Sequence, residues 1–431
     1  MRKRRILVKQ GRVIDPNSRR DEITDILICE ERICKIEKEI KEKEVEVIDA
    51  RGKIVIPGLV DIHTHLREPG REDEESIKSG AEAGAKGGFT TLCCMANTQP
   101  VVDNQEVVRF IYEKAKEARI NIYPFGAVSK GLKGEELAEF GELKEAGVIG
   151  LSDDGRPISD AKLLRRALEY AQMFSLIISV HSEEERLSER GQMNEGFFST
   201  KLGLEGIPDI AESIAVARDI QIAEFLHLPL HFAHISTRKS VDLIREAKKR
   251  GVRITCETAP QYFSLEESLL CGFDTNLKVN PPLRSKEDVE AIKEGLSDGT
   301  IDAIASDHAP HSEEEKNLPF DKAPFGSIGL ETALAVGITE LVEKKVLTLS
   351  GLIEKMSLNP ARIFNLPAGE LDVGKQADLV VVDMDRRWKV KKEDILSRSK
   401  NSAFLGRELK GLVMTTICKG EVVYTFNGDN L

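Results

Sequence analysis

Residues 57–70 of the chain read Pro57-Gly-Leu-Val-Asp-Ile-His-Thr-His-Leu-Arg-Glu-Pro-Gly70. Two histidines, His63 and His65, are two residues apart at the end of this apolar run. Side chains alternate between the faces of a strand, so both imidazoles project from the same side of its carboxyl end. Two ligands of one metal ion need this arrangement. The spacing therefore predicts a strand that ends in a metal site.

The composition points to a small-molecule ligand. The chain has 431 residues, enough for one barrel-sized domain and a smaller one. Its formal net charge of −11 argues against a nucleic acid or an anionic membrane as the main partner, because both would repel it. The sequence also lacks an apolar run of the roughly 18 residues that a membrane span needs.

The cysteines favour a reducing compartment. There are seven, an odd number, and they lack the Cys-x-x-Cys pairs of a zinc ribbon or a redox site. The first residues after the basic start read as a strand and not as the apolar core of a signal peptide. We therefore expect a cytoplasmic protein.

Both ends of the chain have a strand-like pattern. Residues 1–57 and 367–431 contain short apolar runs, separated by turn residues such as glycine and Asp-Pro. Neither end alone has enough strand to close a core. We predict that the two ends combine into one small β domain.

Residues 58–366 alternate apolar runs with segments of helical spacing, such as 160–174, 207–226 and 236–250. This alternation predicts an α/β fold, a (β/α)8 TIM-like barrel that forms the catalytic domain. There are nine candidate strands, so one run is not a barrel strand. The runs are Leu59–His63, Thr90–Met95, Asn121–Val128, Val148–Leu151, Leu176–Val180, Leu230–Ile235, Val252–Glu257, Leu277–Val279 and Ala303–Ser306.

A barrel of this kind has its chemistry at the carboxyl ends of its strands. The candidate residues follow such ends: His181, His234, Asp307, and the neighbours Asp153 and Asp154. Alone, each has an ordinary structural interpretation as a packing, capping or turn residue. Together with the first two histidines they form a set of imidazoles and carboxylates, which suits zinc and predicts metal-assisted hydrolysis.

Two further histidines are assigned to packing or to the surface. His231 and His234 are three residues apart on one run, so they face opposite ways and only one can enter the barrel. We choose His234. His231, and His227 before the run, stay outside the predicted site.

These motifs resemble the amidohydrolase superfamily and, within it, the dihydroorotases of the long bacterial type. The His-x-His pair marks only the superfamily, whereas the extension from Leu66 to Gly70 and the segment from Asp307 to His311 are more selective. The resemblance covers nearly the whole chain. The matching motifs are Gly11-Arg-Val-Ile-Asp-Pro16, residues 57–70, Met95-Ala-Asn-Thr-Gln-Pro100, Asn280-Pro-Pro-Leu-Arg284, Ser306-Asp-His-Ala-Pro-His311, Asn359-Pro-Ala-Arg362 and residues 374–383.

The resemblance implies the reversible cyclisation of N-carbamoyl-L-aspartate to L-dihydroorotate in pyrimidine synthesis, with one or two Zn²⁺ ions per chain. His63, His65 and Asp307 would hold one zinc, and His181 and His234 a second. Asp307 would also be the catalytic general base and acid for a zinc-activated water.

The resemblance also implies the substrate contacts. Arg67 would pair with a substrate carboxylate, with Asn97 and His311 as its helpers. Asn280 and the backbone at Phe325 and Gly326 would bind the ring amide. His308 lies beside a ligand and faces away, so it receives no role.

The bridging ligand departs from much of the superfamily, which uses a carboxylated lysine between its two metals. Residues 147–155, Gly147-Val-Ile-Gly-Leu-Ser-Asp-Asp-Gly155, contain no lysine. The long bacterial dihydroorotases resemble this chain in using an aspartate instead. We expect Asp153 in this position, with Asp154 as the alternative.

The charged segment between His311 and Phe325 has the character of a lid or a partner-binding surface. The resemblance implies a complex with aspartate carbamoyltransferase, and we expect an oligomer. Two other functions stay open: another cyclic amidase, similar to dihydropyrimidinase or allantoinase, and a non-catalytic dihydroorotase-like partner of the carbamoyltransferase.

Overall fold

The computed structural model describes residues 4–428. Strands from the two ends of the chain form one eight-stranded sheet in the order β17-β16-β15-β5-β1-β2-β3, with β4 beside β1. Its strands are β1 (Arg5–Asp15), β2 (Arg20–Cys29), β3 (Arg32–Glu37), β4 (Glu46–Asp49), β5 (Ile54–Pro57), β15 (Leu379–Lys389), β16 (Glu408–Cys418) and β17 (Glu421–Thr425).

Strand β5 joins the two halves of this sheet. It runs parallel to β1 and antiparallel to β15, with Leu379 opposite Pro57 and Val382 opposite Ile54. Both faces of this pairing are buried. Val55 contributes to a core within the sheet, whereas Ile54 and Ile56 pack into the large core of the barrel. This alternation with period two attaches the sheet to the barrel.

The barrel prediction is confirmed. Parallel strands form two runs, β6-β7-β8 and β9-β12-β13-β14. Leu151 bridges Gly126 to Ile178, and His308 bridges back to Thr64, so the two runs close on each other. The strands are β6 (Leu59–Thr64), β7 (Phe89–Cys94), β8 (Asn121–Pro124), β9 (Ser179–Val180), β12 (Leu230–Phe232), β13 (Ile254–Thr258) and β14 (Ala303–Ile304).

The surplus strand candidate is Leu277–Val279. It follows a short 3-10 turn, Thr275–Leu277, and pairs with no strand among residues 4–428. Its residues are buried all the same. A short apolar run indicates burial, and burial is shared by strands and by loops that pack under other segments.

Helices cover the barrel where amphipathic spacing predicts them. In α4, for example, Asp160 accepts hydrogen bonds from the backbone at the helix start, and Leu164, Ala167 and Leu168 are buried on one face. The helices are α1 (Ile77–Gly87), α2 (Gln105–Ala115), α3 (Phe140–Ala146), α4 (Ala161–Gln172), α5 (Glu185–Ser188), α6 (Phe197–Leu202), α7 (Ile210–Leu226), α8 (Arg238–Lys249), α9 (Lys286–Ser297), α10 (Glu313–Lys316), α11 (Ala333–Gly337), α12 (Leu349–Ile353) and α13 (Asn359–Ile363), and a small ladder, β10 (Met193–Asn194) with β11 (Gly206–Ile207), lies beside α6.

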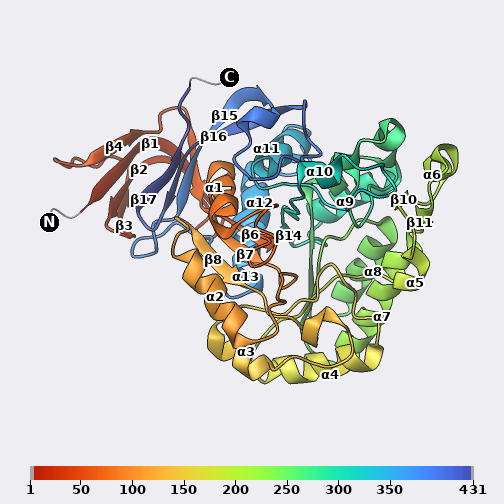
Figure 1. The fold of residues 1–431 in the computed structure, drawn as a ribbon. Helices are drawn as coiled ribbons and strands as arrows, with labels where there is room; N and C mark the ends of the chain where they lie inside the picture. The colour runs from red at the N-terminus through yellow and green to blue at the C-terminus, as the bar shows by residue number, and fades with distance from the viewer. Residues whose placement is uncertain (1–3, 429–431) are drawn as a thin grey trace.

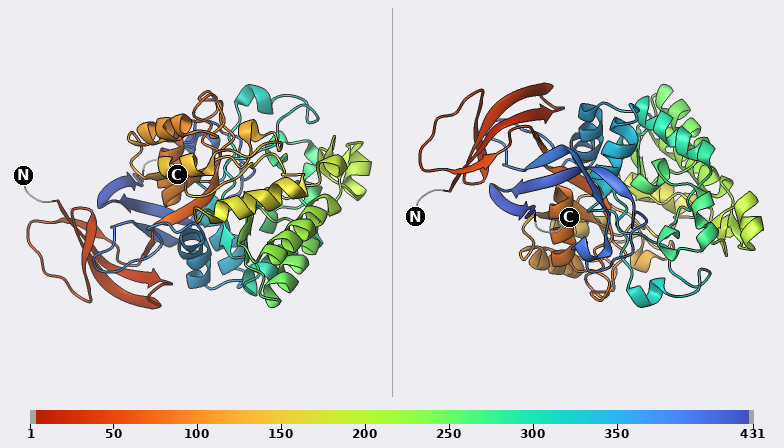
Figure 2. Two further views of the ribbon diagram at one scale, coloured as in Figure 1. Left: turned by 90° about the horizontal axis from the view of Figure 1, so that it is seen from below. Right: turned by 90° about the horizontal axis from the view of Figure 1, so that it is seen from above.

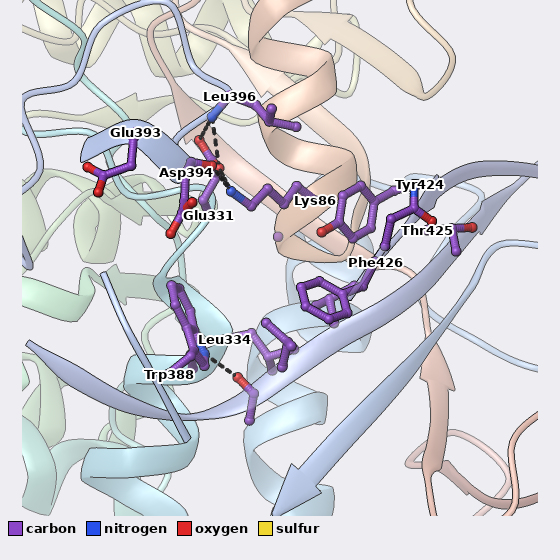
Figure 3. Close-up of a pocket in the computed structure, with 16 residues that line it drawn as sticks. Lys86, Glu331, Leu334, Trp388, Glu393, Asp394, Leu396, Tyr424, Thr425 and Phe426 are labelled. Atoms are coloured by element: carbon purple, nitrogen blue, oxygen red, sulfur yellow. Dashed lines mark hydrogen bonds and ion pairs between the residues drawn. The ribbon is translucent and has the colours of Figure 1, made fainter. Parts of the chain in front are cut away.

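The sheet lies at one end of the molecule, beside the barrel, with the red N-terminal and blue C-terminal strands together (Figures 1 and 2). A cavity of about 350 Å³ lies where α1 and α11 meet strands β15, β16 and β17, and its walls include Trp388, Tyr424 and Phe426 (Figure 3). It shares no lining residue with the pocket that holds the histidines. Within residues 4–428, none of the helices is both long and apolar enough to cross a bilayer.

Candidate active site

The predicted histidines meet at the carboxyl ends of the barrel strands. His63 lies one residue before the end of β6 and His65 lies just beyond it, while His181 follows β9 and His234 follows β12. The ring of His63 lies 5.3 Å from that of His65 and 5.2 Å from that of His234, centroid to centroid. Asp307 follows β14, and its Oδ1 lies 3.6 Å from the Nε2 atoms of both His63 and His65.

Asp154 lies between two pairs of imidazoles. Its Oδ2 is 3.3 Å from His63 Nε2 and 3.4 Å from His65 Nε2. Its Oδ1 is 3.2 Å from His234 Nε2 and 3.7 Å from His181 Nδ1. Each carboxylate oxygen thus faces one pair, and the two resulting triads, each able to hold a metal ion, share this aspartate.

The choice of Asp153 as the bridging residue is therefore corrected. Its Oδ1 accepts hydrogen bonds from the backbone N–H groups of Val128 (2.7 Å) and Ser129 (3.0 Å), and the Ser129 hydroxyl donates to Oδ2. This carboxylate fixes the loop after β8 and is turned away from the histidines. Asp154, the alternative from the sequence, is the carboxylate among the imidazoles.

Hydrogen bonds on the far side of the first pair orient its rings. His63 Nδ1 donates to Glu257 Oε1 at 2.6 Å, and His65 Nδ1 donates to Asn97 Oδ1 at 3.0 Å. In each ring the Nε2 atom is then the one with a free lone pair. His63 Nε2 is buried and has no hydrogen-bond partner among residues 4–428. A buried, unpaired nitrogen of this kind fits a metal ligand.

The second pair is arranged in the same way. His181 Nε2 donates to Glu183 Oε2 at 2.8 Å, which directs Nδ1 into the site. That Nδ1 lies only 2.8 Å from His234 Nε2. Two lone pairs repel at this separation, so a proton or a cation is needed to balance them. The donor set of four imidazoles and shared carboxylate oxygens fits a divalent metal such as zinc.

Asp154 and Glu257 remain ionised. Burial acts to raise the pKa of Asp154, but positive charge among the surrounding imidazoles, whether from a proton or from a bound cation, outweighs burial and holds the pKa well below its usual range. Glu257 behaves similarly: burial is opposed by hydrogen bonds from His231 and His63, and its pKa is lowered to about 2. The pocket is therefore preorganised for cations.

Three site residues have a left-handed backbone that is unusual outside glycine. The φ angles are +61° at Arg67, +32° at His234 and +50° at Asp307. Such conformations cost free energy and are found most often where function requires a side chain to point in one direction. Here they turn side chains into the barrel mouth just as each strand ends.

Asp61, the acidic residue that precedes the two histidines in residues 57–70, has a structural role. It is fully buried, and its Oδ1 accepts hydrogen bonds from the backbone N–H of His63 at 3.0 Å and of Ser306 at 3.2 Å. The first N–H belongs to a histidine of the site, and the second belongs to the residue directly before Asp307. Asp61 thus holds the first and last strands of the barrel in register at the site.

A pocket of about 380 Å³ opens above these residues. Arg67 Nε donates to the Pro310 carbonyl at 3.1 Å, and His311 Nε2 lies 2.8 Å from the Phe325 carbonyl oxygen. Asn280 Nδ2 donates to Glu183 at 3.1 Å. The pocket brings together the predicted substrate residues, and its lining includes Arg67, Asn97, Asn280, His311, Phe325 and Gly326.

The expected role of the Gly326 backbone needs correction. Its N–H donates to the Lys278 carbonyl at 2.9 Å, and its carbonyl accepts from Lys316 Nζ at 2.9 Å. Neither group is free to bind a ring amide. A glycine is required because φ is +143° and an added Cβ would lie 2.8 Å from the Ala309 carbonyl. Gly326 shapes the pocket wall by being small.

Sequence reasoning missed the groups that orient the ligands. Glu257 and Glu183 were not predicted, and the sequence assigned no role to Gln261, whose Nε2 donates to Asp307 Oδ2 at 3.3 Å. Glu257 carried a usable signal, because it is a carboxylate at the end of an apolar run, as Asp307 is. His231, which was assigned to packing, forms a hydrogen bond between its Nδ1 and Thr255 Oγ1 at 2.8 Å. Its Nε2 lies 3.4 Å from Glu257 Oε2.

Comparison with known proteins identifies relatives over the whole chain. The dihydro-orotase-like family model matches residues 52–240, and the amidohydrolase family model matches residues 215–424. A dihydroorotase of Geotalea daltonii is 53% identical over 421 residues, 97% of this chain and 99% of its own length. A dihydroorotase of Acetivibrio thermocellus is 50% identical over 419 residues, 97% and 98% of the two chains. Among solved structures, the L-hydantoinase (dihydropyrimidinase) of Arthrobacter aurescens superposes with a TM-score of 0.86 at 27% identity, covering 97% of this chain and 96% of its own.

Proposed function

The chain belongs to the dihydroorotase family of the amidohydrolases, and we propose that it catalyses the reversible cyclisation of N-carbamoyl-L-aspartate to L-dihydroorotate. It is a cyclic amide hydrolase by that membership. The choice of substrate rests on the position of Arg67, whose guanidinium lines the pocket beside the two histidine pairs. A ring substrate with a carboxylate needs such a partner, and a plain cyclic amide does not.

Zinc is the proposed cofactor, with one or two ions per chain. His63, His65 and Asp307 would hold the first, and His181 and His234 the second, with Asp154 shared between them. The unpaired Nε2 of His63 and the facing nitrogens of His181 and His234 support this assignment. When bound, the metal pair would lower the pKa of a water towards neutrality and polarise the ring carbonyl.

Asp307 is the proposed proton carrier. Its Oδ1 faces the Nε2 atoms of the first histidine pair at 3.6 Å, while Gln261 donates to its other oxygen. During ring opening, Oδ1 would take the proton of the attacking water and give it to the ring nitrogen as the amide C–N bond breaks. In the synthetic direction the same carboxylate would take the nitrogen's proton and help water to leave.

The pocket residues would orient the substrate over these groups. Arg67 would bind the ring carboxylate through its terminal nitrogens, with His311 beside it, and Asn280 and the backbone N–H of Phe325 would bind the ring amide. Asn97 would act both at the pocket wall and on His65, whose Nδ1 donates to its side chain. Binding at both ends would fix which carbonyl is attacked.

A complex with aspartate carbamoyltransferase, an oligomeric state and a cytoplasmic location are further parts of the proposal. The segment after His311 supports the first, because it is charged, flanks the pocket and contains the exposed residues Glu313 and Glu314 on α10. All seven cysteines are free thiols, which fits a reducing compartment. Size-exclusion chromatography of the two enzymes mixed would test the complex, and separate peaks would count against it.

A substrate comparison tests the proposed reaction. The purified chain, supplied with zinc, is assayed for ring opening of L-dihydroorotate, dihydrouracil and hydantoin under the same conditions. We expect a clear preference for dihydroorotate, because only this ring carries a carboxylate for Arg67. Preference for dihydrouracil or hydantoin would favour the activity named for the structural relatives instead. A complete lack of turnover, with and without the carbamoyltransferase, would favour a non-catalytic partner.

A further inference from the structure

Glu74 is a buried carboxylate next to the pocket that the mechanism above does not use. It lies in the loop between β6 and α1 and is only 1% exposed. Its Oε2 forms an ion pair with Arg67, 3.1 Å from Nε, and its Oε1 accepts a hydrogen bond from His311 Nδ1 at 2.8 Å. Arg71 also reaches it, with an N–O distance of 3.1 Å. One carboxylate thus contacts two predicted substrate residues from the side away from the pocket.

Glu74 approaches the guanidinium of Arg67 at Nε and not at the terminal nitrogens. The single N–H at Nε donates to the Pro310 carbonyl at 3.1 Å, and Glu74 Oε2 lies 3.1 Å from the same nitrogen. The terminal nitrogens are the pair that binds a carboxylate in two parallel hydrogen bonds. Fixing Nε therefore sets the direction in which this pair points.

The contact with Glu74 orients the ring of His311. Its Nδ1 faces the Glu74 carboxylate at 2.8 Å, and a carboxylate accepts hydrogen bonds, so Nδ1 is the donor. Its Nε2 lies 2.8 Å from the Phe325 carbonyl and 3.3 Å from the terminal nitrogen NH2 of Arg67. The imidazole and the guanidinium are thus held side by side at the pocket wall.

The buried guanidinium of Arg67 needs a counter-charge beneath it, because an unpaired charge is costly to bury. Glu74 supplies one negative charge, and Glu315 supplies a second through its contacts with Arg71 at 2.8 Å and His311 at 3.5 Å. Glu74, His311 and Glu315 also have the spacing of a metal triad. The arginines on these carboxylates make the cluster an ion-pair network instead.

We propose that Glu74 is a positioning residue that holds Arg67 and His311 together as one recognition unit for the substrate carboxylate. This inference rests on the proposed function. It assigns Glu74 to substrate selection and leaves the bond-making step to the groups around the metals. Its removal should weaken binding of a carboxylated ring more than it slows turnover.

The test compares Glu74→Gln with the parent enzyme loaded with zinc. The amide keeps the shape of the side chain but removes the charge, so it loses the ion pair with Arg67. We expect the KM for L-dihydroorotate to rise about 10- to 100-fold, while kcat changes by less than about threefold. The zinc content should stay at the parent level. Asp73→Asn is the matched control, because it removes one charge from the exposed neighbour in the same loop.

Dihydrouracil, the same ring without the carboxylate, separates positioning from general damage. Glu74→Gln should leave its ring-opening rate, or its inhibition constant if turnover is too slow, unchanged within about twofold. Equal losses on both rings would overturn the proposal, because they would mean a structural role. Glu74→Asp keeps the charge but is too short to reach both partners, so it should also raise KM, and it remains testable if the glutamine variant does not fold.

The remaining outcomes distinguish this inference from its premise. If the parent turns over dihydroorotate and both Glu74 variants keep its KM, the role of Glu74 is wrong and the proposed function stands. If the parent lacks activity on dihydroorotate, the proposed function fails and this inference fails with it.

Discussion

Replacing Asp154 by asparagine should remove metal from the site, whereas the same change at Asp153 should not. The two residues are neighbours and equally buried, at 3% exposure each. One oxygen of Asp154 faces each histidine pair, at 3.3 Å from His63 and 3.2 Å from His234. Asparagine keeps only one of these oxygens and carries no charge, so at least one ion loses a ligand and both lose a counter-charge.

The expected loss of metal affinity follows from the metal ligand that each substitution removes or keeps. Removing a group that merely orients a metal ligand costs about 10- to 100-fold in metal affinity, and a direct shared ligand should cost more. We expect Asp154→Asn to lose about one ion per chain relative to the parent and at least about 100-fold in kcat/KM. Asp153→Asn removes a charge that accepts hydrogen bonds from Val128 and Ser129. It should keep its metal and lose roughly 1–3 kcal/mol of stability.

The assay measures metal and stability on the same samples. Both variants and the parent are loaded with zinc, passed over a desalting column with a weak chelator, and analysed for zinc by elemental analysis. Chemical unfolding then gives the stability of each. The reasoning is refuted if Asp153→Asn loses its zinc while Asp154→Asn retains the parent stoichiometry.

Two further changes test the surroundings of the site. Glu257→Ala removes the acceptor for His63 Nδ1 and should weaken zinc binding about 10- to 100-fold in a chelator competition, and an unchanged affinity would contradict the orienting role. Burial lowers the pKa of Lys316, which donates to the Pro324 and Gly326 carbonyls, from 10.5 to about 7. Between these values the unfolded chain binds one proton more than the folded chain, so stability rises with pH from about 7 towards 10.5. Relative to Lys316→Met, the parent should therefore gain about 1.4 kcal/mol per pH unit in this window, measured by urea unfolding at pH 7, 8 and 9. Parallel pH dependences of the two proteins would refute the shifted titration.

The barrel and the strands that carry the candidate metal ligands could be predicted because they depend on periodicity. The two-residue spacing of His63 and His65 places both on one strand face, and His181, His234 and Asp307 follow apolar runs. A parallel barrel brings the ends of such runs to one mouth. The sheet from both ends of the chain could be expected for a similar reason, since neither end has enough strands to bury a core.

The errors arise where backbone turns decide the outcome. Asp153 and Asp154 follow the same run, and the geometry of the loop after Leu151 alone determines which side chain enters the barrel. The left-handed backbone at His234 likewise has no sequence pattern. Leu277–Val279 reads as a strand because it is apolar and buried, although it packs as a loop.

The supporting residues were harder still to predict. Glu257, Glu183 and Glu74 come from separate loops and strand ends. Glu257 and Glu74 contact histidines far away in sequence, whereas Glu183 contacts His181, two residues before it. A glutamate in a chain with 31% charged residues carries no signal of burial. Only the packed structure distinguishes these carboxylates from the many at the surface.

Anomalous diffraction at the zinc edge, from crystals of the zinc-loaded chain, tests the central claim most directly. The account predicts two peaks at the barrel mouth, one against His63 and His65 and one against His181 and His234, with Asp154 in contact with both. Peaks that Asp154 does not touch, or a zinc ion held by Asp153, would contradict it.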